Sequence, residues 1–121
     1  MIKNVDLVTI PVKDQKRALA FYTEKLGFTV FTDKPFNDQQ RWIELKIGGA
    51  QTKVVLFTPP GQESRAGGFT GLTLACDDLD QTYEELVKRG VEFVSPPRKE
   101  PWGSMAMLKD SEGNQFVVSA K

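Results

Sequence analysis

The chain has 121 residues, which is the size of one domain with its own hydrophobic core. Its 16 Lys and Arg residues balance its 16 Asp and Glu residues, so neither nucleic acid nor an anionic membrane is expected as a partner. The absence of histidine excludes imidazole acid–base catalysis, histidine-containing nucleophile triads and imidazole metal ligands.

The single cysteine, Cys76, cannot form an internal disulfide, which suits a reducing compartment. The first ten residues include Lys3 and Asp6 and lack an apolar run of signal-peptide length. No stretch approaches the roughly 20 apolar residues of a membrane-spanning helix. We therefore expect a cytoplasmic protein that does not associate with membranes. The strand position of Cys76 predicts a buried, structural thiol.

The chain contains one pattern twice. Residues 7–31 and 71–94 each read as a strand, an acidic helix cap, an amphipathic helix and a second strand. Asp14 and Asp78 are placed to cap the two helices, because a carboxylate accepts hydrogen bonds from the first free N–H groups. Gly27 and Gly90 are placed to end them in the left-handed conformation.

Three further strands are predicted after each helix, at residues 28–33, 40–47 and 52–58 and at residues 91–94, 104–109 and 115–119. Residues 32–41 are predicted to be a polar loop and residues 98–100 a solvated one. A linker at about 59–68 separates module one, about 1–58, from module two, about 69–121. The predicted fold is therefore α+β, a single domain of two βαβββ modules, with a curved mixed sheet, helices outside and a concave cleft.

Alternation along the strands assigns two faces to the sheet. One face is almost wholly apolar and is predicted to lie under the helices; it comprises Val8, Ile10, Val12, Val54, Leu56, Leu72, Leu74, Phe116 and Val118. The other face mixes small, polar and apolar residues and comprises Leu7, Thr9, Pro11, Lys53, Val55, Phe57, Gly71, Thr73, Ala75, Gln115, Val117 and Ser119. Such a mixture is typical of a binding face, although packing against a second subunit would also explain it.

The segments "LVTIPVKD", "ALAFYTEKLGFTV", "LTLACDDLD" and "DSEGNQF" together resemble the vicinal oxygen chelate superfamily, the glyoxalase, bleomycin-resistance and extradiol-dioxygenase group. The resemblance covers nearly the whole chain. It implies a glyoxalase-like fold and a homodimer whose clefts lie near the interface. It does not imply one activity, because the superfamily includes isomerases, dioxygenases, thiol transferases and metal-free binding proteins.

Enzymes of that superfamily hold a divalent metal with residues from the first and last strand of each module. The matching positions here are Leu7, Val55, Gly71 and Val117, and none of these side chains can donate a lone pair. The resemblance therefore implies a fold without its metal, and we expect neither a metal site nor a cofactor. An oxygen-only site from Asp6, Glu44 and Gln115 has no support in their spacing.

The candidate ligand-binding residues combine aromatic or apolar walls with polar contacts. Trp42 and Glu44 share a strand face, and Trp102 lies in a loop that shapes the cleft mouth in similar proteins. Trp42 and Glu44 could instead be a sheltered tryptophan and its neighbour on an exposed strand face. Met105 could instead belong to the ordinary packing of the core. The predicted walls are Trp42, Phe57, Trp102 and Met105, and the predicted polar contacts are Thr9, Glu44, Thr73 and Gln115.

The leading interpretation is a metal-free protein that binds a small, partly apolar or aromatic molecule in its cleft. The alternative is an enzyme of the same fold, a lyase, isomerase or dioxygenase, with a non-standard metal site. A third possibility is a module that serves only as a dimeric partner.

Overall fold

The computed structural model describes all residues, 1–121, as two compact units, Met1–Ala66 and Gly67–Lys121. The elements of the first unit are β1 (Leu7–Ile10), α1 (Gln15–Ala20), the π-helical turn η1 (Phe21–Lys25), β2 (Thr29–Pro35), β3 (Arg41–Lys46), β4 (Lys53–Leu56) and the short 3₁₀ helix η2 (Glu63–Arg65). Its sheet has the order β1-β4-β3-β2, in which β1 and β4 run parallel and the other neighbours antiparallel.

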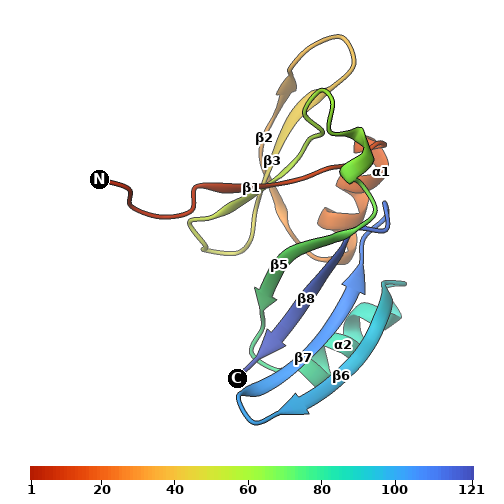
Figure 1. Ribbon diagram of the computed structural model, residues 1–121. Coiled ribbons are helices and arrows are strands. Elements are labelled where there is room, and N and C mark those ends of the chain that lie inside the picture. The colour runs from red at the N-terminus through yellow and green to blue at the C-terminus, as the bar shows by residue number, and fades with distance from the viewer. The chain divides into compact units, whose positions relative to one another are not determined.

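The second unit repeats this topology. Its elements are β5 (Phe69–Ala75), α2 (Leu79–Lys88), β6 (Glu92–Glu100), β7 (Gly103–Lys109) and β8 (Gln115–Ala120), with the sheet order β5-β8-β7-β6. Helix α2 packs against β6, β7 and β8, and Figure 1 shows it along one side of this sheet. The predicted α+β class and the two βαβββ modules are confirmed, and each unit builds a mixed sheet of its own.

The helix ends follow the sequence. Asp14 accepts a hydrogen bond from the N–H of Arg17 at 3.0 Å, and Asp78 accepts one from the N–H of Gln81 at 3.1 Å. Gly27 and Gly90 adopt positive φ angles of 79° and 86°, which glycine tolerates best. Both predicted caps and both predicted stops are confirmed.

The core of each unit lies between its helix and its sheet. In the first unit Ala18 and Tyr22 are buried, as is a group of strand residues, Ile10, Ile43, Leu45, Val54 and Leu56. In the second unit the buried residues include Leu79, Leu86, Ala106, Leu108, Phe116 and Val118. Val12 is buried as well, so six of the nine residues predicted to face the helices are buried, whereas Val8, Leu72 and Leu74 keep partial exposure.

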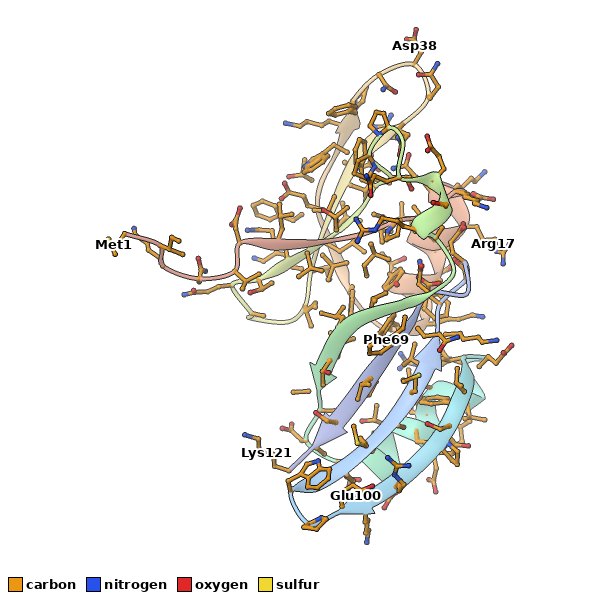
Figure 2. All side chains as sticks on the ribbon, in the orientation of Figure 1. Met1, Arg17, Asp38, Phe69, Glu100 and Lys121 are labelled. Carbon is orange, nitrogen blue, oxygen red and sulfur yellow. The ribbon has the colours of Figure 1, made fainter.

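The predicted polar loop at residues 32–41 is wrong in extent. Strand β2 continues to Pro35 and β3 begins at Arg41, so only residues 36–40 form the loop. The Asn37 side chain closes it by accepting hydrogen bonds from the N–H groups of Gln39 and Gln40, and Asp38 lies at its tip (Figure 2). The polar residues at the end of β2 form a strand because they pair with β3, and their composition alone did not indicate this pairing.

Strand β6 is longer than predicted, and Arg98–Glu100 is strand instead of a solvated loop. The predicted strand ended at residue 94, but β6 continues through Pro96 and Pro97, although proline cannot donate to a ladder. However, β6 is an edge strand, where a missing donor can face solvent. The register shifts between Phe93 and Ser95 and again between Ser95 and Arg98, which accommodates the two prolines.

The turn Asp110–Asn114 is held by buried side chains. Asp110 accepts hydrogen bonds from the N–H groups of Glu112 and Asn114 and from the Asn114 side-chain amide, all at 2.8–2.9 Å. Asn114, fully buried, also accepts a bond from the N–H of Gly67 at 2.8 Å. These contacts explain the "DSEGN" sequence by turn geometry, and they also anchor the entry to β5.

Cys76 is half-buried, so the predicted burial of its thiol is wrong in degree. No helix is long and apolar enough to cross a membrane.

Candidate functional site

The first unit has an open sheet face, which we define as the face turned away from α1. Strand register places Thr9 beside Val55, and Val55 beside Glu44, on this face. Cross-strand partners point to the same side of a sheet, so these three residues form one row across three strands. Thr9 and Glu44 are half-buried, and Val55 is fully buried.

An aromatic group lies at one end of the open face. The ring centroids of Trp42 and Phe57 are 5.2 Å apart, and those of Phe36 and Phe57 are 4.8 Å apart. Phe57 is buried, Trp42 is half-buried and Phe36 is exposed, so the group runs from the sheet to the solvent. A hollow of about 320 Å³ beside it is lined by Lys34, Pro35, Phe36 and Trp42. Aromatic groups arranged in this way offer rigid faces on which a planar molecule can stack.

Glu44 is oriented by the same group. The Trp42 indole N–H donates a hydrogen bond of 2.8 Å to the Glu44 carboxylate, which confirms that the two side chains share a face. The bond fixes the indole plane and directs the carboxylate along the strand toward Trp42. Glu44 therefore helps to position the aromatic surface.

Two lysines and an exposed phenylalanine lie at the other end of the open face. The ammonium nitrogens of Lys46 and Lys53 lie 5.5 and 4.7 Å from the centroid of the Phe31 ring. Phe31 lies where the register of β2 against β3 shifts, between Val30 and Thr32. A bulge of this kind turns a side chain out of its regular alternation.

The second unit has an open face of a different chemistry. Register places Thr73, Val117 and Met107 in one row, and Ala75, Ser119 and Met105 in the next. A hollow of about 360 Å³ lies over β6 and β7, where the bulged strand β6 departs from regular pairing; its lining comprises Ser95, Pro96, Pro97, Arg98, Met105, Ala106, Met107 and Val117. Methionine side chains adapt to irregular ligands, so this surface is apolar and deformable.

One charged pair borders this hollow. Arg98 donates to Glu100 at 2.7 Å, and its side chain is 72% exposed. An exposed pair of this kind contributes about 0–1 kcal/mol to stability, so the guanidinium can exchange Glu100 for another acceptor at little cost.

The structure groups the predicted residues by unit. Thr9, Trp42, Glu44 and Phe57 lie on the open face of the first unit, and Thr73, Met105 and Gln115 lie on that of the second. Trp102 lies in the turn between β6 and β7, is 71% exposed and does not line the hollow of the second unit. Gln115 pairs with Lys109 and with Phe69, the residue labelled at the start of β5 in Figure 2.

Several surface residues escaped the sequence prediction. Lys46 alternates with Glu44 and Trp42, so strand period alone could have placed it on the open face. Phe31 depends on a bulge that no local pattern indicates. Pro96 and Pro97 were not expected to belong to a strand at all.

The positions that would hold a metal in a related enzyme do not fit one. Leu7, Val55, Gly71 and Val117 have no donor atoms in their side chains, and Gly71 lies at a register shift of β5 with a φ of 78°. No group of three or more Cys, Asp or Glu side chains is arranged to hold a metal ion. The donor chemistry of these residues therefore disagrees with metal-dependent catalysis of the family type.

Comparison with known proteins gives a consistent result. Residues 4–118 match the family model "Glyoxalase/Bleomycin resistance protein/Dioxygenase superfamily". The uncharacterized protein YetH of Bacillus subtilis (strain 168) is 33% identical over 118 residues, which are 98% of each chain.

Solved structures agree with the sequence match. A member of the same superfamily from Sphaerobacter thermophilus has a TM-score of 0.90 at 37% identity and covers 99% of this chain and 98% of its own. TnmS3, an antibiotic binding protein from Streptomyces sp. CB03234, has a TM-score of 0.86 at 35% identity, with 98% and 96% coverage.

Proposed function

Because the chain belongs to the Glyoxalase/Bleomycin resistance protein/Dioxygenase superfamily, we propose that it binds a small, partly aromatic molecule without the help of a metal ion. The similarity to an antibiotic binding protein supports a binding role. The four donor-free positions described above favour binding over metal-dependent catalysis.

One observation carries the proposal, namely the aromatic group on the open face of the first unit. Trp42 donates a hydrogen bond to Glu44 and packs beside Phe57, so its orientation is set before a ligand arrives. Preorganised side chains lose little conformational entropy on binding. Thr9 supplies a hydroxyl on the same face, and Glu44 has a second carboxylate oxygen. A planar molecule with one or two polar groups suits this surface.

The second unit carries a binding surface of its own. Its hollow is floored by Met105, Met107 and Val117 and is bordered by Arg98. We propose that this surface by itself can bind an apolar molecule of irregular shape, with Thr73 and Gln115 as its polar contacts. The homodimer remains a prediction from the family resemblance, and sedimentation of the purified protein would measure it.

Calorimetric titration with a neutral aromatic probe, 2-naphthamide, tests the proposal in the presence of EDTA. We expect saturable binding, and Trp42→Ala should weaken it about tenfold, because stacking on an indole ring contributes of order 1 kcal/mol beyond its buried area. Trp102→Ala removes the other tryptophan, which is exposed, and should leave the affinity unchanged.

Metal analysis of the same preparation completes the test. We expect well under one transition-metal ion per chain. Stoichiometric metal, together with probe binding that disappears in EDTA, would replace the proposal with a metal-dependent one.

A further inference from the structure

Two ammonium groups converge on one aromatic ring at the edge of the open face of the first unit. Lys46 and Lys53 come from different strands, β3 and β4, and both place their nitrogens above Phe31 at the distances given above. The face of the Phe31 ring attracts each ammonium group, whereas the two like charges repel each other, so an anion bound beside them would reduce that repulsion. Both lysines are half-buried, which reduces the solvent screening of their charge.

No carboxylate neutralises these lysines. Neither lysine belongs to the ion pairs that join Asp33 with Arg41, Glu85 with Arg89, Glu100 with Arg98 and Glu92 with Lys109. Glu44, two residues before Lys46 on the same face, is instead bonded to the Trp42 indole. The hydrogen bond to the neutral indole holds the Glu44 carboxylate toward Trp42, and Glu44 forms no ion pair with Lys46.

Lys53 lies at the start of β4, next to β1. Lys53 is the register partner of Leu7, the first of the four donor-free positions. This face therefore carries fixed positive charge from side chains, although its residues do not suit a metal ion.

We propose that the open face of the first unit selects aromatic molecules that carry a carboxylate, with Lys46 and Lys53 binding the anion beside Phe31. This inference rests on the proposed function and names its ligand class. The aromatic body lies toward Trp42 and Phe57, and the carboxylate lies toward the lysines. Thr9, Glu44 and Val55 form the row between these two ends of the face. Each lysine donates a charge-assisted hydrogen bond, which is stronger than a neutral one.

A pair of probes with one shape and different charge tests the proposal. Calorimetry would compare 2-naphthoate with its neutral isostere 2-naphthamide on the wild-type protein. We expect 2-naphthoate to bind at least about tenfold more tightly, the usual effect of one hydrogen bond to a charged group. The preference should shrink as salt is raised, because screening weakens partly exposed charge interactions.

Variants then locate the charge. Lys46→Gln and Lys53→Gln should each reduce the naphthoate preference by about threefold and change naphthamide binding much less, whereas the double variant should abolish the preference. Lys53→Arg keeps the charge and should retain most of the preference. Lys16→Gln is the matched control, because it removes the same charge from an exposed position on α1.

The outcomes separate the two proposals. Equal affinity for the two probes, or a preference that survives the double variant, would overturn the anionic ligand class while leaving the proposed binding function in place. If neither probe binds at millimolar concentration, the binding function fails and the ligand class fails with it.

Discussion

The two units have the same order of strands but different open faces. In the first unit this face carries rigid aromatic rings, Phe36, Trp42 and Phe57, and a pair of lysines on Phe31. In the second unit the corresponding face is lined by methionines beside a bulged edge strand. The helix-facing sides are far more alike: Leu45 in β3 and Leu108 in β7 are both fully buried at equivalent places.

This difference separates what the fold requires from what a ligand would require. A helix packed on a mixed sheet needs apolar side chains at fixed positions, and both units supply them. The open faces carry no such requirement and have diverged in charge, stiffness and shape. The following predictions test where the two units behave alike and where they do not.

The largest expected effect is common to both units. Leu45→Ala and Leu108→Ala should each lower the free energy of unfolding by about 3 kcal/mol, because each leaves a cavity in a core that cannot fully collapse. Denaturant unfolding monitored by circular dichroism measures both. A loss below about 1 kcal/mol at either position would show that the two cores are not equivalent.

The turns before the last strands should differ. Asp110→Ala should lower the free energy of unfolding by about 2–3 kcal/mol. It leaves several donors without an acceptor, including the buried Asn114 amide. The first unit closes its turn through the backbone, with the N–H of Ala50 donating to Ile47. Gln51→Ala there removes only an exposed contact with Asn4 and should change stability by under about 0.5 kcal/mol. Equal losses in the same unfolding experiment would contradict this contrast.

The connection after the first strand is also made differently in each unit. The buried Thr58 hydroxyl accepts from the N–H of Val12 at 2.9 Å and donates to its carbonyl at 2.6 Å. In the second unit the N–H of Cys76 bonds directly to the carbonyl of Ser119. Thr58→Val should therefore cost about 1–2 kcal/mol, whereas Ser119→Ala should be nearly neutral. Thermal unfolding of both variants measures these changes in stability. If Thr58→Val were as stable as the wild type, the Thr58 hydroxyl would not stabilise this connection.

The smallest effect concerns the register shift in β5. Gly71 has a φ of 78° and open space where a Cβ would lie, so Gly71→Ala should cost about 1 kcal/mol through backbone strain alone. Gly49→Ala is the control, since Gly49 also borders open space but does not adopt a positive φ, and it should be neutral or slightly stabilising. If thermal unfolding showed no loss of stability for Gly71→Ala, the backbone at this register shift would have to adopt a conformation that alanine tolerates.

Much of this architecture could be predicted from local sequence, because caps and stops depend on a few neighbouring residues. An aspartate can cap the start of a helix through its carboxylate, as Asp14 and Asp78 do. A glycine can end a helix with a positive φ, as Gly27 and Gly90 do. The shared face of Trp42 and Glu44 followed from strand period in the same way. The internal repeat then gave the topology, since one module predicts the other.

The features missed by the sequence analysis depend on pairing between distant segments. Strand β2 extends through polar residues up to Pro35 because β3 lies beside it, and β6 extends through Pro96 and Pro97 because it is an edge strand. The position of Phe31 over the lysines depends on a bulge in that pairing. No local pattern could have shown that Glu44 would bond to Trp42 instead of forming an ion pair with Lys46.

The central claim is that the open face of the first unit binds aromatic molecules without a metal ion, and heteronuclear NMR tests it most directly. Trp42 and Trp102 are the only tryptophans, so each indole N–H gives its own resonance. Titration with 2-naphthamide in EDTA should move the Trp42 resonance saturably and leave that of exposed Trp102 in place. A Trp42 resonance that does not move, or that moves only after a divalent metal ion is added, would contradict the account.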